Sequence, residues 1–274
     1  WTSGPRISIS DCYHRLKGTE WDPWEYWLMR SRRCKMVAVR DKITARGLRN
    51  HGVEVVSPGN PMMDGLAKSQ CPNEFEKYRR LILLCGSRLP EAYYNFKQLL
   101  ISIQFIRISS SMAVFVPLNS SSMQKKIELI LLELGFTTNH ESQSKIGISG
   151  IWKKKSLHIL IGVDQFSSWA NWGEVGIANA GTATEQLVGL GIPCVSLPGK
   201  GPQFNFNFAK RQSRLLGGAV AISKGYKALA EQVEFLLNYD FDRESIGLRG
   251  SKRMGPEGGS KSLALIISTK LSQG

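Results

Sequence analysis

Residues 179–212 read NAGTATEQLVGLGIPCVSLPGKGPQFNFNFAKRQ. Two glycine-containing turns, at 181–182 and 199–202, each precede a stretch that reads as helical, and the apolar run 192–197 lies between them. A short apolar run between amphipathic stretches indicates a buried strand flanked by helices. This order is typical of ordinary α/β loops, but it also places both turns where they can face one phosphorylated ligand.

The same alternation extends in both directions from this stretch. Short apolar runs predict strands at 81–85, 113–116, 157–161, 175–178, 192–197 and 219–222. Helical periodicity predicts helices at 91–106, 122–134, 182–190, 204–216 and 226–237. Continuous apolar strands alternating with amphipathic helices predict an α/β fold with a parallel, doubly wound sheet. The loops after the carboxyl ends of such strands share one edge of the sheet.

The first 80 residues show this pattern only in part. Residues 36–40 and 53–56 are expected to form strands around a helix near 44–50, and 139–150 is expected to be a polar loop.

These patterns divide the chain into parts. We interpret 1–66 as the end of a first α/β domain, 67–78 as a linker and 79–257 as a nearly complete second domain. Apolar residues at helical spacing within 258–274 predict a C-terminal helix that can pack back on the first domain. The chain begins with Trp1 and not with Met, so we expect a fragment of a larger protein.

Composition restricts the classes of partner and site. The net charge of +14 favours anionic partners, namely nucleic acid, acidic lipid head groups or phosphorylated ligands. Five scattered cysteines without a CxxC pair argue against a zinc site, and Cys85 and Cys194 are expected to be buried thiols in a reducing cytoplasm. No apolar run approaches the roughly 20 residues that span a bilayer.

The stretch LILLCGSRLPEAYYNFKQLL, residues 81–100, contains the first candidate anion site. A strand ends at Cys85, Gly86, Ser87 and Arg88 form a turn, and Pro90 opens a helix. Free N–H groups at a helix start, beside a serine and an arginine, suit an anion. A plain turn with Ser87 as a capping residue explains the spacing equally well.

The second candidate is the turn before residues 182–190. Backbone N–H groups of Gly181, Thr182, Ala183 and Thr184 can face a phosphate. The carboxylate of Glu185 or the amide of Gln186 can accept hydrogen bonds from vicinal hydroxyls such as those of a ribose. A capping box or an acid favoured by the helix dipole is the alternative. Neither GxGxxG nor the P-loop pattern occurs here.

Two further segments carry weaker signals. In 198–203, two glycines allow close approach of the backbone, Lys200 supplies a positive charge and Gln203 offers a donor and an acceptor, although a surface turn also fits. Residues 11–33 interleave tryptophans with arginines, which suits a membrane interface, an acceptor groove, single-stranded nucleic acid or aromatic packing between domains.

Together these motifs resemble a known family. GSRLPEAYYN, AGTATEQLVGLGIPCVSLPGKGPQF, FAKRQSRLLG and RMGPEGGSKSLA resemble the C-terminal half of GT-B glycosyltransferases, in particular the lipid-A-disaccharide synthase family and its related branch typical of cyanobacteria. RDKITARGLRNHGVEVVSPGNPMMDGL is similar to the end of that family's N-terminal domain. The resemblance implies a GT-B fold, in which two Rossmann-like domains with parallel sheets face each other across a cleft. By comparison with that family, the first domain is expected to be incomplete here.

The resemblance also implies a donor site. Its substrate-binding residues are Gly86, Ser87 and Arg88, then Gly181, Thr182, Ala183 and Thr184 near the diphosphate, Glu185 or Gln186 at the ribose, and Lys200 and Gln203 near the diphosphate and sugar. The disaccharide synthases usually carry a hydrophobic residue and then Glu where this chain has Glu185 and Gln186, so which of the two holds the ribose stays open.

The expected function follows from this donor site. The resemblance implies that a UDP-sugar, with UDP-N-acetylglucosamine as the expected donor, donates its sugar to a lipid or glycolipid acceptor by an inverting displacement, and no cofactor or metal ion is expected. The catalytic base is expected outside this chain, so the fragment is expected to be inactive alone. The expected location is cytoplasmic, at the inner face of a membrane, and nucleic acid is not the expected partner. The alternatives are an enzyme resembling UDP-N-acetylglucosamine 2-epimerase and a non-catalytic basic module that binds membranes or nucleic acid.

Overall fold

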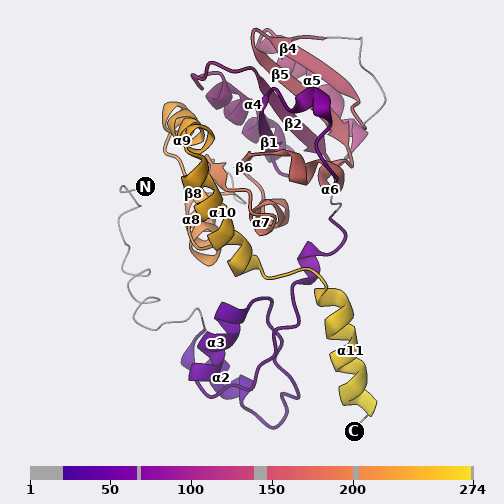
Figure 1. Ribbon diagram of the computed structural model, residues 1–274, viewed down its shortest axis with the longest axis vertical. Helices are drawn as coiled ribbons and strands as arrows, with labels where there is room; N and C mark the ends of the chain where they lie inside the picture. The colour runs from indigo at the N-terminus through magenta and orange to yellow at the C-terminus, as the bar shows by residue number, and fades with distance from the viewer. Residues whose placement is uncertain (1–20, 67–68, 139–146, 200–203, 273–274) are drawn as a thin grey trace. The chain divides into compact units, whose positions relative to one another are not determined.

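The computed structural model describes residues 21–66, 69–138, 147–199 and 204–272 (Figure 1). Contacts between residues divide the chain into two compact units. Among the described residues, unit 1 contains 21–64 and 255–272, and unit 2 contains those between 65 and 254. Within the described ranges, each helix is too short or too polar to span a bilayer.

An eight-stranded sheet forms the centre of unit 2. Its strands lie in the order β3 (Thr137–Thr138), β4 (Gly150–Lys154), β5 (Leu157–Val163), β2 (Met112–Leu118), β1 (Arg79–Leu84), β6 (Val175–Ala178), β7 (Cys194–Ser196) and β8 (Val220–Ile222). The six strands from β5 to β8 in this order are parallel, which confirms the predicted parallel sheet. β4 pairs antiparallel with β5, and β3 with β4.

The order of the strands reverses at β1. From β1 the chain moves to β2 on one side, and it later returns to β6 on the other side of β1. Leu81 therefore pairs with Val114 of β2 and with Val175 of β6. Where strand order reverses, the loops after the two strands leave in opposite directions and open a crevice at the carboxyl edge.

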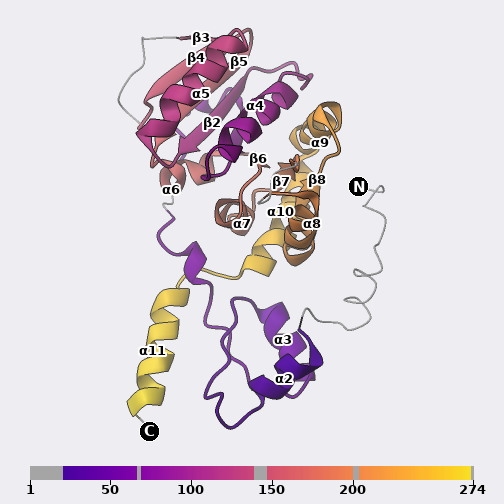
Figure 2. The same ribbon diagram turned by 180° about the vertical axis from the view of Figure 1, so that it is seen from behind.

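Helices connect the strands of unit 2. They are α4 (Glu91–Ile103), α5 (Ser121–Glu133), α6 (Phe166–Trp169), α7 (Thr182–Gly189), α8 (Phe206–Leu215), α9 (Tyr226–Asn238) and α10 (Asp240–Met254), with short 3₁₀ turns η2 (Asn73–Phe75) and η4 (Ala170–Trp172). α4 packs against both α5 and α9. Figure 2 shows α4 and α5 side by side in front of the sheet. The β2 strand is buried at every residue, which explains its continuous apolar sequence.

Helix α10 is absent from the sequence prediction because its composition is polar and two glycines interrupt it. The structure gives these glycines a packing role. A Cβ at Gly247 would overlap the carbonyl oxygen of Gly191, and a Cβ at Gly250 would overlap the side chain of Val188. Both glycines therefore let α10 lie directly against α7 and the turn that follows α7.

Three sequence predictions need correction. The strands expected at 36–40 and 53–56 are wrong, because this region forms only one isolated parallel bridge, between Ala38 and Val56. The loop expected at 139–150 is wrong at its end, where Gly150 begins β4, and residues 139–146 lie outside the described residues. β4 contains one buried residue, Trp152, among half-buried and exposed ones, so a search for continuous apolar runs does not find it.

Unit 1 is small and mostly helical. It contains α2 (Pro23–Met29), α3 (Lys42–Asn50), the 3₁₀ turn η1 (Pro61–Met63) and α11 (Gly259–Ser272). The buried Asp41 caps α3, accepting the N–H groups of Ile43 at 3.0 Å and Thr44 at 2.8 Å. The apolar core of unit 1 consists of Tyr26, Ala45, Leu48, Val53 and Val55.

The start of α11 is fixed within unit 1 by a carboxylate. Asp64 accepts hydrogen bonds from the backbone N–H groups of Gly258 at 2.6 Å and Ser260 at 2.8 Å. Hydrogen bonds from Ser260 and Gly258 lower the pKa of Asp64 below its usual value. The chain segments 61–64 and 258–260, far apart in sequence, are thereby joined.

Replacing Gly247 with alanine tests the packing of α10 against α7. We expect Gly247→Ala to destabilise unit 2 by about 1–3 kcal/mol, because the added methyl group has no space. Thermal unfolding followed by circular dichroism measures the loss. The control is Ser245→Ala on the exposed side of α10, which should change stability by less than about 0.5 kcal/mol. Equal melting temperatures for Gly247→Ala and the wild type would contradict this packing.

Candidate functional site

A pocket of about 590 Å³ lies at the carboxyl ends of β1 and β6, where the strand order reverses. We call it the rim pocket. The loop after β1, the first turns of α4 and α7, the loop after β6 and the start of α8 contribute its wall. The lining residues are Leu84, Cys85, Gly86, Ser87, Arg88, Glu91, Ala92, Asn95, Pro117, Asn119, Asn179, Ala180, Gly181, Thr182, Ala183, Glu185, Gln186, Phe204 and Phe208.

The loop after β1 needs a glycine at its first turn. Gly86 has φ of +88°, a conformation that other residues rarely adopt. A Cβ at this position would also lie 3.1 Å from the carbonyl oxygen of Asn179. Gly86 therefore allows the loops after β1 and β6 to approach each other at the floor of the rim pocket.

Asn179 joins the loop after β6 to the loop after β7. Its side chain is only 2% exposed. Its Nδ2 donates to the carbonyl oxygen of Leu197 at 2.7 Å, and its Oδ1 accepts the N–H of Leu197 at 3.0 Å. A side-chain amide that pairs with both backbone groups of one residue fixes that residue in place.

Asn95 extends this network to α4 and to β1. Nδ2 of Asn179 also lies 3.3 Å from Oδ1 of Asn95, and Nδ2 of Asn95 donates to the carbonyl oxygen of Cys85 at 3.1 Å. The buried pair therefore holds the ends of β1, β6 and β7 together. Sequence reasoning missed both asparagines, and the signal that could have found them is a polar residue within or directly after an apolar run.

The N-terminus of α7 faces the rim pocket without a capping side chain. Its N-cap residue, Gly181, has none, and no side chain of the described residues caps the helix. The first N–H groups of a helix have no partner within it, so those of Thr182 and Ala183 can serve a ligand. A capping box needs an acid three residues after the cap, and Thr184 occupies that position. A capping box with Glu185 is therefore not formed, and the other alternative, an acid in the first turn favoured by the helix dipole, stays open.

Gln212 of α8 holds the turn before α7. Its side chain is buried, and Nε2 donates to the carbonyl oxygens of Gly181 at 3.1 Å and Ala180 at 3.3 Å. These two bonds turn the carbonyl groups toward α8. Sequence reasoning also missed this residue, because a glutamine within a polar helix gives no signal of burial.

The structure brings most of the predicted substrate-binding residues together. Eight of them line the rim pocket: Gly86, Ser87, Arg88, Gly181, Thr182, Ala183, Glu185 and Gln186. Thr184 lies behind the wall, fully buried, and its hydroxyl donates to the carbonyl oxygen of Ala180 at 2.8 Å. Lys200 and Gln203 lie outside the described residues. The ligand assigned to these residues stays a prediction.

Charge in the rim pocket is mixed. Among its described lining residues, Arg88 is the cation, and Glu91 and Glu185 are the acids. Oε1 of Glu91 accepts the N–H of Phe204 at 3.1 Å, which ties α4 to the segment before α8. An anionic ligand therefore depends on Arg88 and on backbone N–H groups.

The rings of Phe204 and Phe208, with centroids 5.4 Å apart, add an apolar wall that sequence reasoning missed.

The Cys85 thiol lies at the wall of the rim pocket but is poorly suited to nucleophilic chemistry. Cys85 and Cys194 are buried, as predicted, and burial raises the pKa of the Cys85 thiol to about 12. Cys85 is therefore not a thiolate nucleophile at neutral pH, although it lines the rim pocket. The described part of the chain contains no group of three or more His, Cys, Asp or Glu side chains that could hold a metal ion.

Comparisons with known proteins place this geometry in a fold class. No family model and no curated protein sequence matches the chain, so the resemblance to the lipid-A-disaccharide synthase family stays a prediction. A Listeria monocytogenes structure assigned as UDP-N-acetylglucosamine 2-epimerase is 12% identical, with a TM-score of 0.55, over 88% of this chain and 60% of its own. MnaA of S. aureus, solved with UDP, is 12% identical, with a TM-score of 0.53, and the match covers 86% of this chain and 60% of MnaA.

These similarities show the fold. Together with the mostly parallel sheet, they confirm the predicted α/β fold of the GT-B type. The glycosyltransferase SnogD from Streptomyces nogalater is 13% identical, with a TM-score of 0.41, over 82% of this chain and 60% of its own. The chain therefore spans about 60% of the length of these three structures.

Replacing Asn179 tests the network beneath the rim pocket. We expect Asn179→Leu to lower the stability of unit 2 by about 2–4 kcal/mol, because the buried N–H and carbonyl of Leu197 lose their partner. The control is Asn119→Leu, an exposed asparagine on the same wall without a hydrogen bond among the described residues. Thermal unfolding separates the two, and equal losses for both variants would show that the network contributes nothing.

Proposed function

We propose that the rim pocket binds the nucleoside diphosphate of a UDP-sugar. The observation that carries this proposal is the meeting of two loops at the reversal of strand order, with the uncapped N-terminus of α7 facing the pocket. Ligands of doubly wound sheets bind in this kind of crevice, and helix N-termini bind phosphates. The shared fold with S. aureus MnaA, which was solved with UDP, supports the choice of nucleotide.

The proposed contacts use the groups that the pocket offers. The N–H groups of Thr182 and Ala183, with the guanidinium of Arg88, neutralise the diphosphate. Glu185 or Gln186 accepts hydrogen bonds from the ribose hydroxyls. Since backbone dipoles and an arginine supply the positive potential, the proposal includes no metal ion.

The proposed reaction of the whole protein is transfer of the sugar to a lipid or glycolipid acceptor. The oxygen of the acceptor hydroxyl attacks the anomeric carbon of the sugar with inversion and forms the new glycosidic bond. The bond between that carbon and the diphosphate breaks, and UDP leaves with its charge stabilised at α7. A base outside this chain takes the proton of the acceptor hydroxyl. The resemblance of 180–204 to the lipid-A-disaccharide synthase family supports this acceptor class and a location at the cytoplasmic face of a membrane.

A second candidate is a UDP-N-acetylglucosamine 2-epimerase activity. The similarity to the Listeria monocytogenes structure assigned to that activity favours it. An epimerase of this kind needs no acceptor, whereas a transferase does. Incubating the full-length protein with UDP-N-acetylglucosamine and separating the products by chromatography distinguishes the two. Release of UDP only when an acceptor lipid is added supports transfer, and sugar products without an acceptor support epimerisation.

Calorimetric titration with UDP tests the pocket. We expect the chain to bind UDP, and we expect either Glu185→Ala or Gln186→Ala to weaken binding about tenfold, because a ribose hydroxyl loses its acceptor. The other single variant should change affinity by less than about twofold. Glu231→Ala, an exposed acid on α9 outside the pocket, is the control. The proposal fails if the wild type does not bind UDP, or if the double variant binds UDP as tightly as the wild type.

A further inference from the structure

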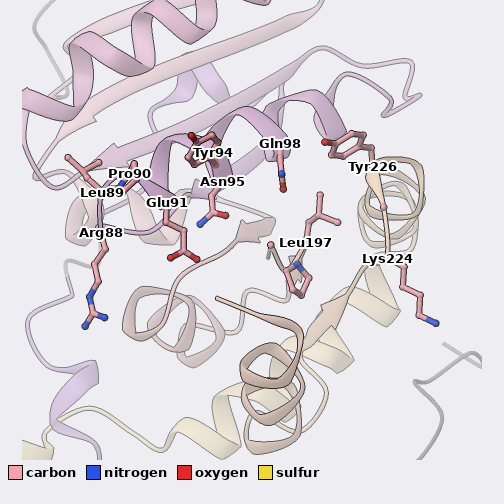
Figure 3. Close-up of a pocket in the computed structure, with 13 residues that line it drawn as sticks. Arg88, Leu89, Pro90, Glu91, Tyr94, Asn95, Gln98, Leu197, Lys224 and Tyr226 are labelled. Carbon is pink, nitrogen blue, oxygen red and sulfur yellow. The ribbon is translucent and has the colours of Figure 1, made fainter. Parts of the chain in front are cut away.

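A second pocket, of about 660 Å³, lies beside the rim pocket in unit 2. We call it the side pocket (Figure 3). The start and first turns of α4, the segment 197–199 after β7 and the segment 224–226 at the start of α9 form its wall. Arg88, Glu91 and Asn95 line both pockets, so the two adjoin at the base of α4.

Some polar side chains of the side pocket already make hydrogen bonds within the protein, and one does not. Glu91, Asn95 and Gln98 lie on one side of α4, and Figure 3 shows them projecting toward the strand end at Leu197. Glu91 and Asn95 already hold the fold, through Phe204 and Cys85. Within the described ranges, the side-chain amide of Gln98 makes no hydrogen bond. Its donors and acceptor are therefore available to a ligand.

The remaining wall is mostly apolar and aromatic, with Lys224 as a further cation in addition to Arg88. Leu89, Pro90, Leu197 and Pro198 supply aliphatic surface, and Tyr226 stands at the end of the pocket next to α9. A pyranose ring combines apolar C–H faces with a rim of hydroxyls. Such a ring matches an apolar wall that carries a few placed amide and hydroxyl groups.

We propose that the side pocket holds the sugar of the nucleotide-sugar whose diphosphate occupies the rim pocket. This inference rests on the proposed function. A nucleoside diphosphate is itself a drug-sized ligand, and the rim pocket, about 590 Å³, has the size that such ligands fill. The attached sugar needs further space. The side pocket offers that space next to Arg88, the residue that the proposal places at the diphosphate. Gln98 and Tyr226 then determine which sugar is accepted.

Comparing UDP with UDP-sugars on the same variants tests this inference. The ligands are UDP, UDP-N-acetylglucosamine and UDP-glucose, titrated by calorimetry into the 274-residue chain. The variant is Gln98→Ala with Tyr226→Ala, and both side chains lie at the surface of the pocket, outside the core. The control is Tyr239→Ala, an exposed tyrosine at the far end of α9 that lines neither pocket.

The expected result is selective. The double variant should bind at least one UDP-sugar about tenfold more weakly than the wild type, while its affinity for UDP changes by less than about twofold. An unchanged ratio of UDP-sugar to UDP affinity would overturn the inference, and so would wild-type binding of UDP without binding of either UDP-sugar. Both outcomes leave the proposed binding of UDP in the rim pocket unaffected. A wild type that does not bind UDP overturns the proposed function itself.

Discussion

The buried hydrogen-bond network of Asn179 and Asn95 is the constraint on which the site depends. Two amides, almost without solvent exposure, connect the ends of β1, β6 and β7 through the backbone groups of Cys85 and Leu197. Burying polar groups is favourable only when each finds a partner, so the network tolerates little displacement of any loop. The floor of the rim pocket is fixed by the same bonds that complete the fold, and the side pocket shares Asn95 with it.

The remaining packing of unit 2 supports this edge of the sheet. Gly86 permits the loops after β1 and β6 to approach, and Gly247 and Gly250 let α10 lie against α7. The N-terminus of α7, held from the other side by Gln212, presents its free N–H groups to the pocket. The proposed neutralisation of a diphosphate therefore uses groups whose orientation is set before a ligand arrives, which limits the cost of reorganisation.

Much of the fold is predictable from sequence, and less of the site is. Apolar runs locate the six parallel strands because most residues of those strands are buried, and periodicity locates the helices between them. β4 and α10 escape this reasoning, since β4 is mostly half-buried or exposed and a glycine-containing polar helix shows no apolar face. A polar residue within or directly after an apolar run is a signal for Asn95 and Asn179, but their partners and those of Gln212 are distant in sequence, so the roles of all three are not predictable. The turns at Gly86 and Gly181 are predictable, because parallel strands place their following loops at one edge.

The proposed placement of the nucleotide is most directly tested by a crystal structure of the chain grown with saturating UDP. The diphosphate should lie within hydrogen-bond distance of the N–H groups of Thr182 and Ala183, beside Arg88, with the ribose next to Glu185 or Gln186. The uncapped start of α7 should then be occupied, with Asn179 still bonded to Leu197. UDP bound elsewhere in unit 2, with the rim pocket empty, would contradict the placement.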